Sequence, residues 1–394
     1  MRRTKRQRIV KMELIRDMKE EKLIVNNRER AMAILNYATH DRLPIVHFGF
    51  WQETLEKWKN EGHLTSDEIT SIGDGSPTEN AIASKLGFDF NWYTTFGGHY
   101  GLRPSFESKV IEIMPDGFKK VVTGDGVVIL QKEGATSIPA EVDHLLKDRK
   151  SWEELFLPKL QFSMDRINTQ AIERLKKDSR DTPLGIHCGS LFGQIRNWLG
   201  LESSCYLYAD DESLYDEIID TVGTLCYKGT EAILASGLKF DFAHFWEDIC
   251  FKNGPLVIPS VFDAKVGPHY KKITDLVNKY GINIVSLDCD GMIDSLIPTW
   301  IQNGVNTMFP IEVGTWNGNI APWREKYGRS IRGVGGMNKT KFAKDYAAID
   351  IEIERLKPLV DLGGFIPCPD HRIAPDAKWE NVQYYCEKMR KRFS

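Results

Sequence analysis

Residues 281–291, GINIVSLDCDG, decide how the rest of the chain is interpreted. The apolar run 282–287 is bounded by turn residues, which is typical of a strand buried on both faces. It ends in Asp288, Cys289 and Asp290. Because side chains alternate along a strand, we expect the two aspartates to point one way and Cys289 the other. Buried carboxylates need water, a cation or a proton, so this stretch predicts half of a metal site or half of an acid–base site.

A second interpretation of the same residues is structural. Asp290 followed by Gly291 precedes an apolar segment, 292–302, that has the pattern of a helix. An aspartate at this place is an ordinary helix N-cap, whose carboxylate accepts from free backbone N–H groups. The stretch alone leaves capping and chemistry both open.

Composition limits the class of protein. The 394 residues are 42% hydrophobic and 27% charged with a formal net charge of -3, which gives no reason to expect binding to nucleic acid or to a membrane surface. No apolar run approaches the roughly 20 residues of a membrane span. The basic N-terminus lacks the apolar segment of a secretory signal. Seven cysteines without a CxxC pair favour reduced thiols and a cytoplasmic protein.

Short apolar strands alternate with helices over most of the chain. They lie near residues 45, 90, 185, 242, 285, 308, 333 and 365. Alternation of this kind implies a parallel sheet, and eight units at this length predict an α/β protein of the (β/α)8 TIM-barrel class. We expect a basic, helical N-terminal extension at 1–40 and the barrel at 41–394. Residues 106–132 alternate around two Asp-Gly turns, which predicts an antiparallel β insertion.

Polar residues gather where the predicted strands end. The carboxyl ends of the strands form the active-site face of such barrels, so a group of polar residues at these ends predicts a site. Each of these residues taken alone is more simply explained as a packing residue. The predicted metal ligands are Glu247, Asp288, Asp290 and His371, with zinc as the expected ion. The same carboxylates, Asp288, Asp290 and Glu247, are equally suited to acid–base catalysis. The residues expected to bind substrate are His47, Trp51, Tyr93, His187, His244, Trp246 and Arg372.

Several segments together resemble one family. They are RERAMAILNYATHDRLPI (28–45), GSLFGQIRNWLGLE (189–202), WEDICFKNGPLVIPSVF (246–262), VSLDCDGMIDSLIPTWIQNGVN (285–306), RGVGGMNK (332–339) and GGFIPCPDHRIAPDAKWENV (363–382). The chain resembles the uroporphyrinogen decarboxylase-like superfamily over 27–393. This superfamily includes decarboxylases and corrinoid methyltransferases, and the resemblance implies its TIM barrel.

The resemblance also carries expectations for the site. Zinc methyltransferases of the family are expected to hold metal with a His-x-Cys at one strand end and a later Cys. Here Asp288-Cys289-Asp290 matches the first motif and His371 matches the later Cys, so sulfur is replaced by oxygen and nitrogen ligands. The family's decarboxylases are expected to carry an arginine-rich stretch at the first strand. Residues 47–54 contain no arginine, which argues against an octa-acidic porphyrinogen.

The leading prediction is a corrinoid-dependent methyltransferase that moves a methyl group from a small donor to a separate corrinoid protein. The chain has no DxHxxG-type corrinoid motif, so the corrinoid is expected on that partner. A methoxylated aromatic donor is preferred because aromatic side chains are expected to line an apolar pocket. They are Trp51, Trp92, Tyr93, Phe96, Tyr100 and Trp246. The alternatives are a uroporphyrinogen decarboxylase-type enzyme, with the aspartates as proton donors, and a catalytically silent barrel. The resemblance also makes a homodimer reasonable.

Overall fold

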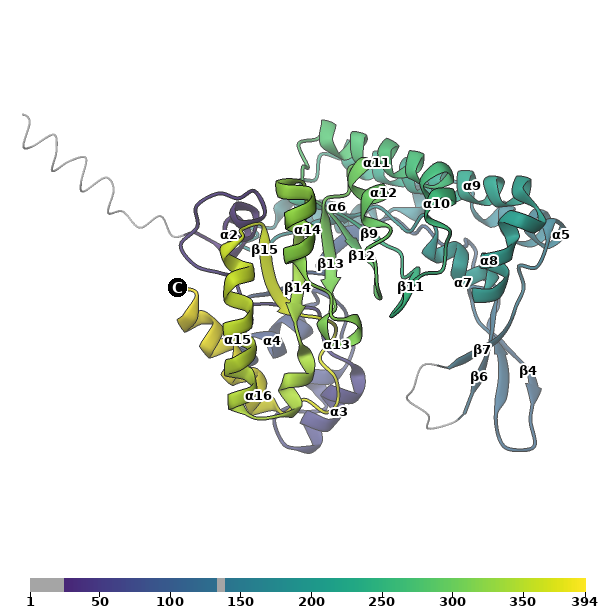
Figure 1. The fold of residues 1–394 in the computed structure, drawn as a ribbon. Helices are drawn as coiled ribbons and strands as arrows, with labels where there is room; N and C mark the ends of the chain where they lie inside the picture. Colours follow the sequence, from purple (N-terminus) through teal and green to yellow (C-terminus); the bar gives the residue numbers. More distant parts are fainter. Residues whose placement is uncertain (1–24, 133–138) are drawn as a thin grey trace, which may run out of the picture.

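A seven-stranded parallel sheet forms the centre of the molecule (Figure 1). The computed structural model describes residues 25–132 and 139–394, so the helix expected within the first 24 residues lies outside the described part. The strand order is β15-β14-β13-β12-β9-β8-β3. The bounds are β3 (Thr95–Gly97), β8 (Gly185–His187), β9 (Phe242–Trp246), β12 (Val285–Asp288), β13 (Thr307–Ile311), β14 (Arg332–Met337) and β15 (Phe365–Pro369).

Two further strands lie beside this sheet. β1 (Val46–His47) and β2 (Phe90–Asn91) form a separate parallel pair. After β1 the chain pairs with the segment that follows β15, at the β15 edge of the sheet, through an isolated parallel bridge between Phe50 and Ile373. The prediction of an α/β fold with a mainly parallel sheet is confirmed. Within the described residues the ladder of hydrogen bonds does not run around a closed ring, so the closed eight-stranded barrel stays a prediction.

Helices cover the outside of the sheet. Side chains cap two of their starts: Asn26 caps α2 in a capping box, and Ser76 accepts from the backbone N–H of Glu79 at the start of α4. The α-helices are α2 (Asn27–Leu35), α3 (Gln52–Asn60), α4 (Pro77–Leu86), α5 (Arg149–Ser151), α6 (Thr169–Lys177), α7 (Gly193–Leu199), α8 (Leu201–Asp210), α9 (Glu212–Ala235), α10 (Pro259–Lys265), α11 (Gly267–Lys279), α12 (Ile297–Gln302), α13 (Val313–Trp316), α14 (Ile320–Tyr327), α15 (Tyr346–Asp361) and α16 (Trp379–Arg392). Short 3-10 or π turns are η1 (Asp67–Ile69), η2 (Trp152–Phe156), η3 (Leu157–Lys159), η4 (Met164–Arg166), η5 (Gly328–Ser330) and η6 (Lys339–Ala343).

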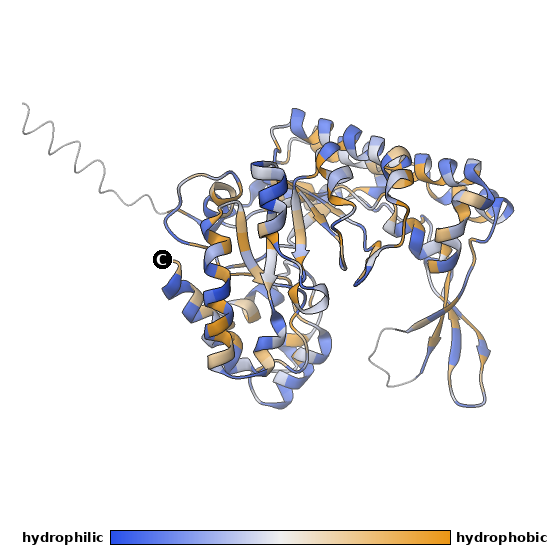
Figure 2. Ribbon diagram, in the orientation of Figure 1, coloured by the Kyte–Doolittle hydropathy of each residue, from blue (hydrophilic) through white to orange (hydrophobic). Residues whose placement is uncertain are grey.

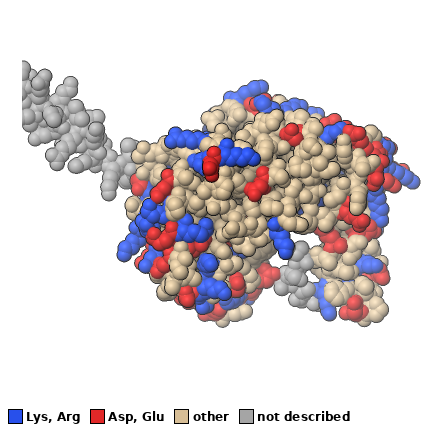
Figure 3. All heavy atoms as spheres, viewed as in Figure 1, with Lys and Arg blue, Asp and Glu red and all other residues tan. Residues whose placement is uncertain are grey.

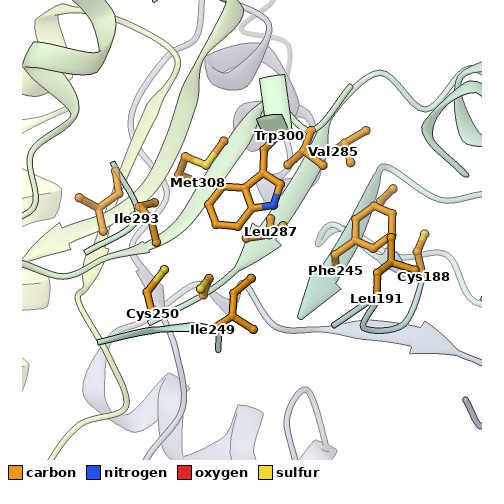
Figure 4. Close-up of a cluster of buried hydrophobic side chains, with 14 of the residues drawn as sticks. Cys188, Leu191, Phe245, Ile249, Cys250, Val285, Leu287, Ile293, Trp300 and Met308 are labelled. Carbon is orange, nitrogen blue, oxygen red and sulfur yellow. The ribbon is translucent and has the colours of Figure 1, made fainter. Parts of the chain in front are cut away.

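The strands separate an inner hydrophobic core from an outer one. The inner core combines residues of β9, β13, β14 and β15 with residues of the separate pair β1 and β2, so the sheet and this pair enclose it. Its members on strands are Val46, Phe90, Phe242, Phe309, Val334, Ile366 and Cys368. Phe48 lies directly after β1, Ile284 directly before β12, and Ile34 and Leu35 of α2 belong to the same core. The outer core lies between the sheet and the helices. In it Trp300 of α12 lies beside Leu287 and Met308 (Figure 4).

Alternation between these cores decides which polar side chains face inward. On β9, Phe242 belongs to the inner core and Phe245 to the outer one. Ile284, directly before β12, is inner, and Leu287 of β12 is outer. A period of two therefore directs His244 and Asp288 to the inner side of the sheet. In Figure 2 the strands are largely hydrophobic, while the helices turn hydrophilic residues outward.

An antiparallel sheet projects from the body near α7 and α8 (Figure 1). Its strands are β4 (Lys109–Ile113), β5 (Lys119–Val122), β6 (Val127–Gln131) and β7 (Ala140–His144), paired in that order. The sequence predicted an insertion over 106–132, which contains the first three strands. β7 lies beyond that range. A short hairpin, β10 (Cys250–Phe251) and β11 (Gly254–Pro255), fills the Gly/Pro-rich loop after β9.

Surface and cysteine chemistry agree with the composition. Side chains of both charge signs are interspersed on the visible face (Figure 3). None of the helices in the described ranges is long and apolar enough to cross a membrane. All seven cysteines lie in the described residues and are free thiols.

Candidate active site

Three aspartates meet where β9 and β12 end. Ligand oxygens of Asp248, Asp288 and Asp290 all lie within 4.8 Å of one another, and we call these residues the acidic cluster. Asp288 is only 3% exposed, and the other two are half-buried. The backbone N–H of Asp290 donates to Oδ1 of Asp248 over 3.1 Å. Asp248 has a φ of +50°, an uncommon backbone conformation for a residue other than glycine, so the local fold holds it in a constrained position.

Crowding shifts the protonation of the cluster. Burial, with the nearby charges of Asp248 and Asp290, raises the pKa of Asp288 well above its usual value. Burial and then the charge of Asp290 raise the pKa of Asp248 to about 6. Carboxylates this close cannot all be ionised without a compensating charge. The cluster therefore requires either a shared proton or a bound cation.

His371 borders the cluster. Its Nε2 lies 3.2 Å from Oδ2 of Asp290, and its ring stacks on Trp51 with the ring centroids 5.6 Å apart. Nδ1 of His371 and Oδ1 of Asp290 are both buried, and neither has a hydrogen-bond partner among the described residues. Buried polar atoms normally have a partner, so these two atoms indicate a place for a ligand or water.

Arg372 is close to the cluster, but its charge is already paired. Its two guanidinium nitrogens donate to the two carboxylate oxygens of Asp74 over 2.8 and 2.7 Å. The guanidinium lies 5.3 Å from the ring centroid of Phe48. Bidentate pairing fixes its direction and neutralises it. Asp74 was missed by the sequence analysis because it lies in a turn before α4, where nothing in the local pattern distinguishes it from a surface aspartate.

Glu247 has a structural environment instead of the predicted catalytic or metal-binding one. Its fully buried carboxylate accepts from the backbone N–H groups of Leu191, Phe192 and Gly193 over 2.9, 2.9 and 2.7 Å. The hydroxyls of Ser190 and Tyr270 donate to it as well. These donors fix the turn at the start of α7. The structure does not bring Glu247 into the acidic cluster, because Asp248, one residue later, takes the position expected for it.

His47 lies on the outer side of its strand. Its neighbours Val46 and Phe48 belong to the inner core, so the alternation turns His47 outward. Its ring packs against Phe50 and Phe88 at centroid distances of 5.2 and 5.0 Å. This placement gives no support to the expectation that it binds substrate.

Three other predicted substrate residues do come together. The ring of His244 lies 4.9 Å from that of Tyr93 and 5.9 Å from that of His187, centroid to centroid. His244 is fully buried, and neither of its ring nitrogens has a hydrogen-bond partner among the described residues. Burial lowers its pKa well below the usual value, so the ring is neutral. His187 and Trp246 line a cavity of about 370 Å³ on the β8 side of the site.

The two interpretations of residues 288–291 are now separated. Cys289 belongs to the outer core while Asp288 and Asp290 join the acidic cluster, so the predicted alternation is confirmed. The helix-capping alternative is wrong. The helix after this stretch begins at Ile297, its N-cap is Leu296, and no side chain caps it.

Comparison with known proteins adds evidence on the fold. No protein-family model and no curated protein sequence matches the chain. A solved structure described as a methyltransferase from Methanosarcina mazei matches with a TM-score of 0.60 and 15% identity, covering 93% of this chain and 98% of that one. A B12-independent methionine synthase from a Shewanella species, in complex with selenomethionine, matches with a TM-score of 0.47 and 11% identity over 89% of this chain and 99% of that one. The first likeness shows a shared fold; the second adds nothing to the argument.

Proposed function

We propose that the protein is a methyltransferase that moves a methyl group from a small donor to the corrinoid of a separate partner protein, with a divalent metal ion held by the acidic cluster. The observation that carries this proposal is the meeting of Asp248, Asp288 and Asp290 within 4.8 Å. The fold shared with the Methanosarcina methyltransferase is compatible with it.

The cluster fits a cation on physical grounds. Burial and then mutual repulsion raise the pKa values of Asp248 and Asp288, and a divalent ion would compensate both effects by stabilising the ionised carboxylates. It would also give a partner to the buried Oδ1 of Asp290. Three carboxylates and a neighbouring imidazole form an oxygen-rich set that suits zinc and also manganese or magnesium. Zinc is the ion that we propose, with Asp248 in place of Glu247 among the ligands.

The chain's own residues define the remaining chemistry. A metal bound here supplies a Lewis acid for the leaving atom of the donor. His371, stacked on Trp51, orients Asp290. With an ether donor, the bond between methyl carbon and oxygen breaks and its electron pair stays on the oxygen, which later takes a proton from water. The electron pair of the partner's reduced corrinoid attacks the methyl carbon and forms the new bond to it.

One observation favours a second candidate, a decarboxylase. If no metal binds, the raised pKa of Asp248, about 6, keeps a fraction of this carboxyl protonated near neutral pH, and that acid form can protonate carbon. A porphyrinogen with many carboxylates also needs free cations for binding. Arg372 does not supply one, because Asp74 already pairs with it. The methyltransferase is therefore the first proposal.

The test is an assay of methyl transfer from methoxylated aromatics to a cob(I)amide acceptor. The protein is first incubated with zinc, and the change in absorbance of the acceptor measures the transfer. We expect wild type and Asp67→Asn, an exposed control, to be active and Asp288→Asn to be inactive. Formation of coproporphyrinogen from uroporphyrinogen, without methyl transfer to the acceptor, would replace this proposal with the decarboxylase.

A further inference from the structure

The cavity beside the acidic cluster is built from β3, the ends of β8 and β9, the loops that follow β3 and β8, and one residue of α7. It has a volume of about 370 Å³. Trp246 forms one wall and is the register partner of Asp288 on the neighbouring strand, so the cavity and the cluster share the end of β9. Its described lining residues are Thr95, Gly97, Gly98, His99, Tyr100, Gly101, His187, Gly189, Ser190, Gln194 and Trp246.

None of these described lining residues is an aspartate, glutamate, lysine or arginine. Its two histidines are neutral at pH 7. Burial lowers the pKa of His187 to about 4, and burial followed by the charge of Arg166 lowers that of His99. A ligand group that carries a full charge would lose its hydration here without gaining a counter-charge, which is unfavourable. The lining therefore selects for an uncharged molecule.

One hydrogen-bond donor in the cavity has a fixed identity. The backbone N–H of Gly189 donates to Nδ1 of His187 over 3.0 Å. Nδ1 is thus an acceptor, and in a neutral imidazole the hydrogen must then be on Nε2. Gly189 has a φ of +96°, which favours glycine, and a Cβ there would lie 2.4 Å from Sγ of Cys226. The fold therefore holds His187 as an Nε2–H donor.

Aromatic surface completes the lining. The ring of Tyr100 stacks near that of His187 at 6.4 Å, and its hydroxyl donates to the carbonyl oxygen of His187. That hydroxyl is therefore occupied, and Tyr100 offers its ring. Trp246 offers a second aromatic surface. The side-chain amide of Gln194 has no hydrogen bond with the residues that the structure describes, which leaves it for a ligand.

We infer that this cavity binds an uncharged aryl methyl ether as the methyl donor, with the ether oxygen accepting from Nε2–H of His187. The assignment of this ligand as the methyl donor rests on the proposed function. Its chemical class rests on the lining alone. A neutral ring fits the two aromatic walls, and an ether oxygen is an acceptor without charge.

Calorimetric titration of metal-free protein tests the inference with a matched pair of ligands, methoxybenzene and 4-methoxybenzoate. We expect wild type to bind methoxybenzene at least about tenfold more tightly than the anion, since the carboxylate finds no counter-charge. His187→Phe should weaken methoxybenzene binding by about tenfold, the usual value of one hydrogen bond. His40→Phe, an exposed control, should not change it. Gln194→Met tests a second polar wall that is independent of His187.

The inference is overturned if methoxybenzene does not bind, if the anion binds equally well, or if His187→Phe leaves the affinity unchanged while remaining folded by circular dichroism. Binding here needs neither metal nor acceptor. Binding with the expected pattern but without methyl transfer in the assay above would therefore overturn the proposed function alone. Methyl transfer that does not depend on His187 would overturn the inference alone.

Discussion

Glu247 and Asp248 are consecutive acids after the same strand, yet their environments are opposite. Glu247 is fully buried and accepts from three backbone N–H groups and two hydroxyls. Asp248 faces Asp288 and Asp290, which have the same charge. The difference teaches that burial of an acid does not by itself mark a functional site. A carboxylate surrounded by donors holds the fold together, whereas carboxylates that crowd one another need something from outside the chain.

The largest expected effect is the loss of methyl-transfer activity when an aspartate of the acidic cluster is replaced. Asp288→Asn should lower methyl transfer by about a thousandfold, because the substitution removes a ligand charge from the proposed metal site. In the metal-free protein it should also raise the free energy of unfolding by about 1 kcal/mol at pH 8, since repulsion within the cluster is relieved. Initial rates and urea unfolding measure the two effects. A variant that loses stability in step with activity would contradict this assignment.

Glu247→Gln should have the opposite sign in stability. We expect the free energy of unfolding to fall by about 3 kcal/mol, because an amide accepts fewer of the donors around position 247 and adds two N–H groups to a buried site. Glu202→Gln, an exposed change on α8, is the control. Urea unfolding gives both values. If Glu247→Gln costs no more than Glu202→Gln, the structural role of Glu247 is wrong.

The pH dependence of stability tests the crowding itself. The pKa of Asp248 is about 6 in the folded protein and near its ordinary value of 3.8 when unfolded. The folded state therefore binds the proton more tightly, and this contribution to stability is full below pH 3.8 and is lost as the pH rises through 6. At about 1.4 kcal/mol per pKa unit, the loss in metal-free protein is about 2 to 3 kcal/mol. Asp248→Asn should reduce this slope and leave the part that comes from Asp288, which unfolding curves at pH 4, 5, 6 and 7 would show.

The smallest effect is expected at the edge of the cluster. His371→Phe keeps an aromatic ring against Trp51 but removes the nitrogen that lies 3.2 Å from Asp290. Loss of such a positioning contact typically lowers metal affinity by about tenfold. Competition with a chromophoric chelator measures the affinity. An unchanged affinity would show that His371 neither binds the ion nor orients its ligand.

The sequence predicted the sheet and much of the site through one rule, the alternation of side chains along strands. That rule correctly separated Asp288 and Asp290 from Cys289. It failed at His47 because apolar residues occur at both the odd and the even positions of the first strand. Only contacts with other segments decide which of the two sets of alternate residues faces inward. At 244–248 the same rule, counted in steps of two from His244, selects Asp248 and rejects Glu247, in agreement with the structure.

Other features of the site depend on contacts that no local pattern contains. The pairing of Asp74 with Arg372 joins residues that are 298 positions apart. The donors around Glu247 come mostly from the turn before α7. The break in the strand ladder beside β1 likewise depends on how distant segments meet. These contacts arise from tertiary packing. The sequence therefore predicted the positions of the strand ends correctly, but it did not predict every contact partner of the residues that lie there.

Metal content tests the central claim most directly. Elemental analysis should be run on wild type, Asp288→Asn, His371→Ala and Glu247→Gln, all exposed to zinc and then desalted under identical conditions. We expect about one zinc ion per chain in wild type and Glu247→Gln, a reduced amount in His371→Ala, and none in Asp288→Asn. Folded wild type that takes up no zinc, manganese or magnesium, or Asp288→Asn that retains as much metal as wild type, would contradict a metal site at the acidic cluster.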